Sequence, residues 1–283
     1  EARTHLLLIQ SQLSAKRPDL ALNALKAAPA SVAAFPERFV AEAVAHHALK
    51  DKPSAFEALT RGLENFPGQS ILRRRRLLLL VELGLARTAA EEAPTVLADA
   101  EAPDDFLTVA TALREIKQPL EAAHLLEQAR LRFPESEDVV TQLALADHEA
   151  GRHLTAAEIL LPLALVDDEK SLFAAELYRR AKRLRRATRA NARVADQKKK
   201  LRQRLGLLIE GQRWELAAGL EDRLARLGLL DDQELLYALA YAHYRVGRHP
   251  HAESLLSRLT EPELFERALV LRKAMASCRD GGR

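Results

Sequence analysis

Apolar residues recur along this chain at the three-to-four spacing of a single buried helical face. In the segment 119–133 they are Leu120, Ala123, Leu125, Leu126, Ala129 and Leu131. No segment alternates apolar and polar residues with the period of two that is typical of a half-buried β-strand. The pattern therefore predicts an all-α protein.

The expected helices are short and follow one another in pairs. Glycines mark points where a helix has to stop and turn, at Gly84, Gly151 and Gly247. Asp104 and Asp232 stand just before apolar runs, where an acidic side chain can cap free backbone N–H groups and suit the helix dipole. We therefore expect about eight helical hairpins and a terminal helix near residues 265–277.

Alanines recur along the chain with a period of about 34 residues. They are Ala21, Ala55, Ala89, Ala122, Ala156, Ala218 and Ala252. The steps are 33 or 34 residues, except for one of 62 residues after Ala156, which we interpret as one full unit and one unit shortened by six. Two helices approach closely only where the side chain between them is small, and a larger one would cost about 1–3 kcal/mol. A fixed period of this size predicts a repeat solenoid.

This pattern resembles the tetratricopeptide repeat family, whose unit pairs two antiparallel helices and carries alanine at a fixed position. The residues that match best are Ala110, Leu113, Ala122, Leu126, Ala129 and Pro134. The resemblance covers roughly 250 of the 283 residues. The unit that begins near Ser171 departs from the pattern, which leaves its second helix open. The resemblance implies a right-handed superhelical solenoid of about eight antiparallel hairpins with a C-terminal capping helix.

We expect one continuous array over residues 1–283, because a solenoid grows by addition and needs no single central core. Regular repeats would cover about 2–168 and about 205–262, with an irregular basic unit at about 169–204. No apolar run reaches the length of about 18 residues that spans a bilayer. The chain begins with Glu1, as a processed product would, and similar Ala- and Leu-rich arrays occur in bacterial envelope machines, including those that export exopolysaccharides. The resemblance thus favours a periplasmic or envelope-associated setting over a cytoplasmic one.

Charge is distributed unevenly along the chain. The whole chain has 43 Lys or Arg and 40 Asp or Glu, but residues 179–204 contain thirteen Lys or Arg and one acid, Asp196. We call residues 179–204 the basic segment. The candidate docking residues within it are Arg179, Lys182, Arg183, Arg186, Arg189, Arg193, Lys198, Lys199, Lys200 and Arg204.

The basic segment suits an acidic protein partner better than the alternatives. Readers of nucleic acid usually add aromatic stacking, and only Tyr178 stands at the edge of the segment. Membrane docking favours a large apolar face, which alanine does not supply. A second copy of this chain, with its acidic remainder, is another candidate. Two alternatives stay open: a solvated helix or helix pair without a ligand, and a nucleic-acid-binding or regulatory module.

The resemblance implies that the first helix of each unit lines a concave groove for a partner segment. The residues at those positions are Arg74, Arg75, Thr108, Thr111, Arg114, Thr141, Gln142, Tyr237, Tyr241 and Tyr244. Their hydrogen-bonding and cationic groups suit carboxylates and peptide backbones. The three tyrosines lie at spacings of four and three on one helical face, so packing against the terminal helix is an alternative for them.

No sequence motif indicates catalysis or a bound cofactor. His148 and His153 are five apart around the turn at Gly151, whereas zinc-binding helices place histidines four apart. His249 and His251 flank a proline and could form only a weak surface site. Neither a phosphate-binding glycine loop nor a nucleophile elbow is present. We therefore expect no cofactor, no metal and no enzymatic activity, and a scaffold that binds other proteins.

Overall fold

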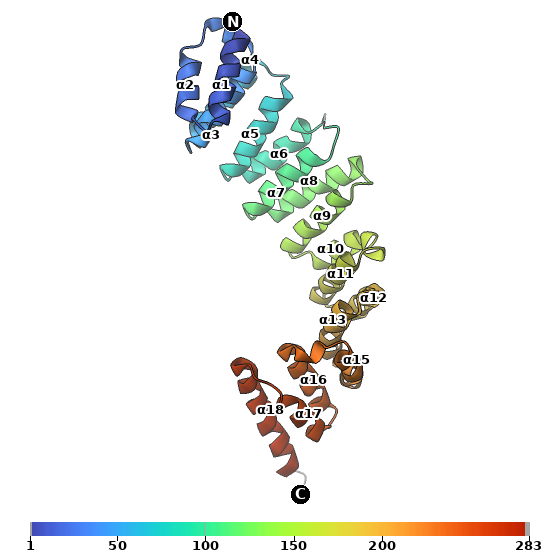
Figure 1. Cartoon of the computed structure of the whole chain (residues 1–283). Helices are drawn as coiled ribbons and strands as arrows, with labels where there is room; N and C mark the ends of the chain where they lie inside the picture. Colours follow the sequence, from blue (N-terminus) through green and yellow to red (C-terminus); the bar gives the residue numbers. More distant parts are fainter. Residues whose placement is uncertain (1, 99, 281–283) are drawn as a thin grey trace. The chain divides into compact units, whose positions relative to one another are not determined.

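The computed structural model describes residues 2–98 and 100–280, with side chains as far as residue 276. Throughout these residues the regular structure is helical (Figure 1), which confirms the predicted all-α class. The chain divides into two compact units, Glu1–Ala150 and Gly151–Arg283. Each unit has buried hydrophobic clusters of its own.

Unit 1, residues 1–150, is a series of helical hairpins. Its elements are α1 (Ala2–Ser14), α2 (Pro18–Lys26), a 3₁₀ turn (Ala30–Ala34), α3 (Glu37–Ala48), α4 (Lys52–Asn65), α5 (Ser70–Glu82), α6 (Ala86–Val96), α7 (Asp104–Glu115), α8 (Pro119–Arg132) and α9 (Glu137–Glu149). Consecutive helices pack on each other, and each first helix also contacts the first helix of the next pair, as α5 contacts α7. The predicted helix start at Asp104 is confirmed, but Pro103 occupies the N-cap position and no side chain caps α7, so Asp104 is an acidic residue of its first turn.

Unit 2, residues 151–283, contains helices of 5 to 19 residues. Its elements are α10 (His153–Leu160), a 3₁₀ turn (Leu163–Leu165), α11 (Asp168–Arg180), α12 (Leu184–Arg193), α13 (Gln197–Glu210), α14 (Trp214–Ala218), α15 (Glu221–Arg226), a 3₁₀ turn (Leu229–Asp231), α16 (Gln233–Arg245), α17 (His249–Leu256) and α18 (Pro262–Asp280). Asp232 caps α16 by accepting a hydrogen bond from the Leu235 N–H at 3.1 Å. The expected terminal helix is α18, which packs on α16 and α17.

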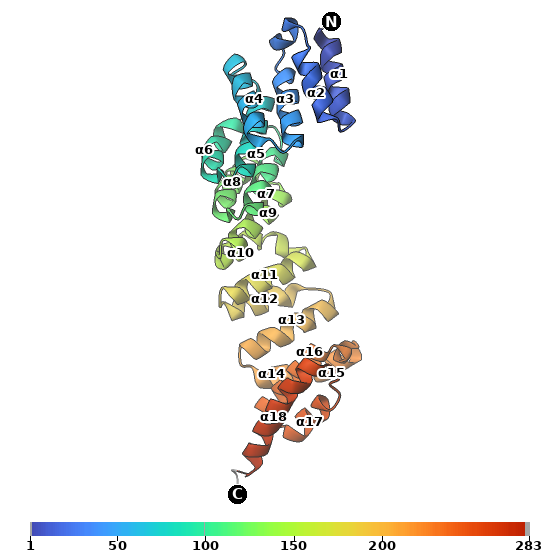
Figure 2. The ribbon, with the colours of Figure 1, turned by 90° about the vertical axis from the view of Figure 1, so that its left-hand side faces the viewer.

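The basic segment is not one long helix, because two turns divide it among three helices. It covers the end of α11, all of α12 and the start of α13, and these three helices lie side by side (Figure 2). The chain turns at Ala181–Arg183 and again at Val194–Asp196. The second helix of the unit near Ser171, which the sequence left open, is therefore α12.

A left-handed backbone residue marks the turn within each helix pair. These residues are Lys16, Lys50, Gly84, Lys117, Gly151, Lys182, Gln212 and Gly247, with φ between 54° and 79°. Glycine adopts this conformation without steric cost, and the other residue types carry a strain of about 1–2 kcal/mol. The turn is thus a fixed feature of the repeat, even where the sequence does not supply glycine.

The alanine period is confirmed and extended by these turns. Five residues after each turn residue stands a buried alanine, at most 1% exposed: Ala21, Ala55, Ala89, Ala122, Ala156, Ala187, Ala217 and Ala252. Ala187 fills the 62-residue gap, and Ala217, not Ala218, occupies the equivalent position in α14. From Gly151 to Lys182 is 31 residues and from Lys182 to Gln212 is 30. The interpretation of one full and one short unit is therefore wrong, because both units are shortened.

Candidate functional site

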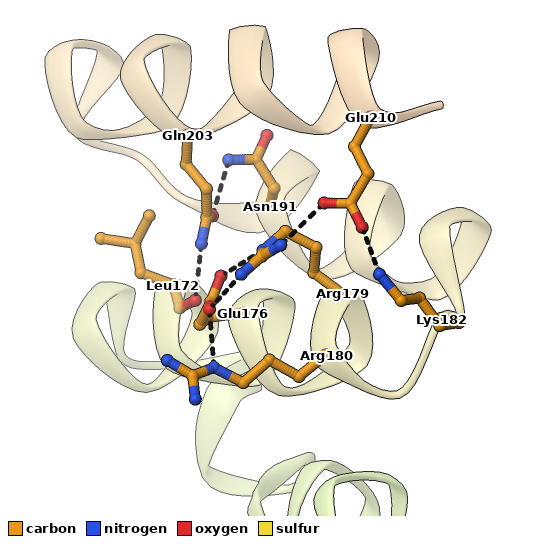
Figure 3. Close-up of polar contacts among 8 residues, drawn as sticks. All are labelled: Leu172, Glu176, Arg179, Arg180, Lys182, Asn191, Gln203 and Glu210. Carbon is orange, nitrogen blue, oxygen red and sulfur yellow. Dashed lines mark hydrogen bonds and ion pairs between the residues drawn. The ribbon is translucent and has the colours of Figure 1, made fainter. Parts of the chain in front are cut away.

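A buried polar network fixes α12 between α11 and α13 (Figure 3). Asn191 is fully buried on α12, and its Nδ2 donates to the Lys200 carbonyl and to Gln203 Oε1, each at 3.0 Å. Its Oδ1 accepts from Arg204 Nε at 2.7 Å. Gln203 in turn donates to the Leu172 carbonyl of α11 at 2.8 Å. A buried amide has to be satisfied in this way, so the contacts set the position of α12.

Ion pairs fix the end of α11 in the same region (Figure 3). The Arg179 guanidinium makes two hydrogen bonds of 2.7 Å to the Glu176 carboxylate and a third of 2.7 Å to Glu210 on α13. Lys182 Nζ lies 3.0 Å from the other Glu210 oxygen, and Arg180 Nε lies 2.9 Å from Glu176. The hydrogen bonds from Arg179 lower the pKa of Glu176 to about 2 and also hold the pKa of Glu210 below its usual value.

Much of the basic segment is therefore bound within the protein. Arg186 pairs with Glu158 of α10, and Lys199 pairs with Glu169 of α11. Lys200 Nζ donates to the carbonyls of Ala192 and Val194 at 2.6 and 3.0 Å. Together with the contacts of Arg179, Lys182 and Arg204 above, these interactions hold the three helices together, and a ligand can bind these cations only by displacing their present partners. The sequence alone treated all of these cations alike.

Five cations of the basic segment have no side-chain hydrogen bond or ion pair within the described residues. They are Arg183, Arg185, Arg189, Arg193 and Lys198, and all five are exposed. Four of them lie on α12 and its N-cap, while Lys198 opens α13. Four were predicted as docking residues, and Arg185 was missed although it occupies the same helical row as Arg189 and Arg193. We call this row, Arg185, Arg189 and Arg193, the arginine row.

A hollow of about 240 Å³ borders the arginine row. Arg186, Arg189 and Arg193 of α12 line it together with Glu158 of α10 and Tyr178 of α11. The Arg186 guanidinium lies 5.9 Å from the centre of the Tyr178 ring, where a cation–π contact holds it. Of the three arginines that line the hollow, Arg186 is paired with Glu158, whereas Arg189 and Arg193 have no carboxylate partner among the described residues.

The start of α12 adds to this positive potential. Arg183 at the N-cap makes no side-chain capping bond, and the first turn contains no acidic residue. The N-terminus of a helix carries partial positive charge, so each cation placed there costs about 0.3–1 kcal/mol at the surface. Because the cations at the start of α12 and the positive end of the helix dipole repel each other, binding of an anion there is favourable.

In unit 1 four of the seven expected groove residues line one of two hollows. Thr108, Thr111 and Gln142 line a hollow of about 520 Å³ between α7 and α9, which Glu115 and Asp138 make acidic. Arg75 lines a separate hollow of about 160 Å³ at α3, α4 and α5, beside His47 and Glu82. Thr141 is half-buried on α9 and lines neither hollow.

The other two arginines predicted for the groove are neutralised by neighbouring helices. Arg74 Nη1 lies 2.8 Å from Asp105 Oδ2. Arg114 binds both oxygens of Glu149, at 2.9 and 2.6 Å, and also donates to Gln142. Hydrogen bonding from Arg114 lowers the pKa of Glu149. These pairs tie successive first helices together, so unit 1 offers fewer free cations than its sequence suggests.

The tyrosines of α16 belong to an aromatic cluster. The Tyr241 ring lies 5.6 Å from Trp214 of α14, and the Arg245 guanidinium lies 4.2 Å from the Trp214 ring centre. Tyr244 stacks on His249 of α17 at 5.6 Å. Tyr237 is half-buried against the core that includes α18. Tyr241 therefore packs on α14 and Tyr244 on α17, whereas packing of Tyr237 against the terminal helix, the alternative raised from the sequence, stays a prediction.

The structure also brings together a group that the sequence analysis missed. One side-chain ligand atom from each of Glu221, His243 and His251 lies within 4.8 Å of the others. These residues come from three different helices, so their spacing along the chain gives no sign of the cluster. Their proximity follows only from the packing of α15, α16 and α17.

Among the described residues, none of the helices has the length and hydropathy needed to cross a membrane.

No protein-family model matches the chain, and no curated protein sequence matches it. Solved structures are nevertheless similar in fold. The structure of Naa15/Naa10 bound to HypK-THB is similar with a TM-score of 0.58 and 16% identity, over 97% of this chain and 46% of that one, so this chain spans about half of its length. The C-terminal part of a TPR repeat-containing protein from Cytophaga hutchinsonii is similar with a TM-score of 0.55 and 13% identity, over 94% of this chain and 98% of that one. These likenesses bear out a tetratricopeptide-like helical-repeat fold.

Proposed function

We propose that this protein is a non-enzymatic scaffold that binds an acidic segment of a partner protein along the arginine row of α12. The observation that carries the proposal is that Arg189 and Arg193 border a hollow and have no carboxylate partner within the described residues. A guanidinium offers a planar set of donors that matches a carboxylate, which makes it the usual residue for such recognition. The tetratricopeptide-like fold supports a role in protein–protein interaction.

The spacing of the row defines the shape of the partner. Residues four apart on a helix lie about 5–6 Å from each other. Alternate side chains of an extended peptide lie about 6.6 Å apart, because each residue advances the chain by about 3.3 Å. Arg185, Arg189 and Arg193 therefore match an extended segment with acidic residues at every second position. The intervening side chains of such a segment would point away from α12.

Peptide binding tests this proposal directly. A fluorescent peptide that alternates glutamate and serine is titrated with the full chain, and anisotropy reports binding. The double variant R189Q/R193Q should bind about tenfold more weakly, since each exposed charge contact contributes about 0.5–1 kcal/mol. R226Q/R258Q is the matched control, because both arginines are exposed in unit 2 and removing them changes the net charge equally.

Two further peptides separate shape from charge. A peptide of the same composition with its glutamates in one block should bind more weakly, and one with glutamine in place of glutamate should not bind. Equal losses in the two double variants would contradict the proposal, because they would show a diffuse charge effect. Tighter binding of duplex or single-stranded DNA, with a steep salt dependence, would favour a nucleic-acid-binding module instead. A dimer that R189Q/R193Q dissociates would identify the occupant as a second copy of the chain.

A further inference from the structure

Three helices of unit 2 converge on a small cluster of metal-ligating groups. Glu221 opens α15, His243 lies in the last turn of α16, and His251 lies in the first turn of α17. Glu221 Oε2 lies 2.9 Å from His243 Nε2 and 2.7 Å from His251 Nε2. The two imidazole rings are 4.5 Å apart between their centres. One carboxylate oxygen and two imidazole nitrogens thus surround a common point.

His243 is the unusual member of this cluster. It is 2% exposed, and among the described residues neither ring nitrogen has a hydrogen bond of regular geometry. Its Nε2 lies 2.9 Å from the Glu221 carboxylate, at ion-pair distance. A buried polar group without a hydrogen bond costs about 1–3 kcal/mol, so its presence calls for a partner.

The ligand set selects a class of metal ion. Two imidazoles and one carboxylate suit Zn²⁺ and related transition metals, whereas Mg²⁺ and Ca²⁺ prefer oxygen ligands alone. We propose that Glu221, His243 and His251 form a Zn²⁺ site that ties α15, α16 and α17 together. This inference stands independently of the function proposed for α12.

The surroundings of the cluster leave room for a complete coordination shell. Tetrahedral ligands about 2.0–2.1 Å from zinc lie about 3.3 Å from each other, so the two nitrogen–oxygen separations would widen by about half an ångström on binding. Side chains of Glu221 and His251 are 24% and 49% exposed, which allows this movement. A hollow of about 520 Å³, lined also by Asp222 and Arg248, adjoins the cluster. It gives space for a water molecule as the fourth ligand.

Metal binding to the tag-free, chelator-treated full chain tests the inference. Isothermal titration with Zn²⁺ should show one bound ion, and thermal unfolding should shift to higher temperature in its presence. H251A and E221Q, which alter exposed or half-buried ligands, should bind Zn²⁺ at least about tenfold more weakly, because losing even an outer-shell contact costs about 10–100-fold. H249A is the matched control: His249 lies two residues from His251 but stacks on Tyr244 and is outside the cluster.

A spectroscopic measurement keeps the result independent of stability. Co²⁺ bound by the wild-type chain and by H249A should give the visible absorption of a four-coordinate site, and H251A should not. Mg²⁺ should produce neither binding heat nor a thermal shift. Failure of the wild-type chain to bind Zn²⁺, or equal binding by H251A and the wild type, would overturn the inference.

Discussion

Replacing Asn191 with alanine is expected to destabilise unit 2 by about 3 kcal/mol. The side chain is fully buried and makes two neutral hydrogen bonds and one to the charged Arg204. Neutral bonds contribute about 0.5–1.5 kcal/mol each and a charged one about 1.5–3 kcal/mol, which gives a range of about 2.5–6 kcal/mol. Arg204 and Gln203 are only partly buried, so water can solvate them again. The better helix propensity of alanine returns about 0.5 kcal/mol, which places the result near the lower end of the range.

Urea unfolding followed by tryptophan fluorescence measures this effect. Trp214 is the single tryptophan of the chain and lies in α14, so its emission reports on unit 2. The midpoint should move to lower urea with an unchanged slope. Thr188→Ala on the same helix is the control, and it should change the free energy of unfolding by less than about 0.5 kcal/mol. A loss below about 1 kcal/mol for N191A would refute the view that the polar network holds α12 in place.

Two other predictions concern packing and acid stability. Gly62→Ala should destabilise unit 1, because an added Cβ would lie 2.8 Å from the Phe39 Cβ, and overpacking of about 1–3 kcal/mol outweighs a propensity gain of about 1 kcal/mol. The same change at Gly206, which has open space around it, should stabilise α13 by about 1 kcal/mol. Denaturant unfolding measures the stability of both variants. A G62A variant more stable than the wild type would contradict the close packing at Phe39. Because the pairing with Arg179 lowers the pKa of Glu176 to about 2, its stabilisation is complete above the unfolded pKa near 4.5 and is lost as the pH falls towards 2. The stability difference between the wild type and E176Q should therefore be about 1–2 kcal/mol at neutral pH, after solvent screening, and should vanish near pH 2; a constant difference across this range would count against the pairing.

The sequence predicted the helical class, the hairpins and the alanine period because these depend on local and periodic features. A buried alanine recurs since each hairpin meets the same steric limit, and the turn glycines mark a backbone conformation that few residues adopt cheaply. The prediction placed the repeated alanine at Ala218, one residue too late, because the turn in that unit is at Gln212, and glutamine does not indicate a left-handed turn. The preceding turn is at Lys182, which is likewise not a residue typical of a left-handed turn, so Ala187 was not recognised as the alanine of that unit.

The candidate sites were less predictable, for a different reason. Arg179 and Arg189 are the same residue type in the same basic segment, yet Glu210 from the next helix pair neutralises Arg179, and no carboxylate of the described residues pairs with Arg189. Whether a cation is paired depends on the side chains that a neighbouring helix places beside it. Those residues, such as Glu210 for Arg179, lie about thirty positions away in the chain.

Composition and periodicity by themselves therefore determined that this protein is a helical repeat with a strongly basic segment. Only the tertiary structure decided that five of the thirteen cations in that segment lack a side-chain partner among the described residues, and that Glu221, His243 and His251 meet at one point. The physical reason is that helix formation and hairpin turning are short-range, whereas charge neutralisation and ligand geometry act between side chains brought together by packing.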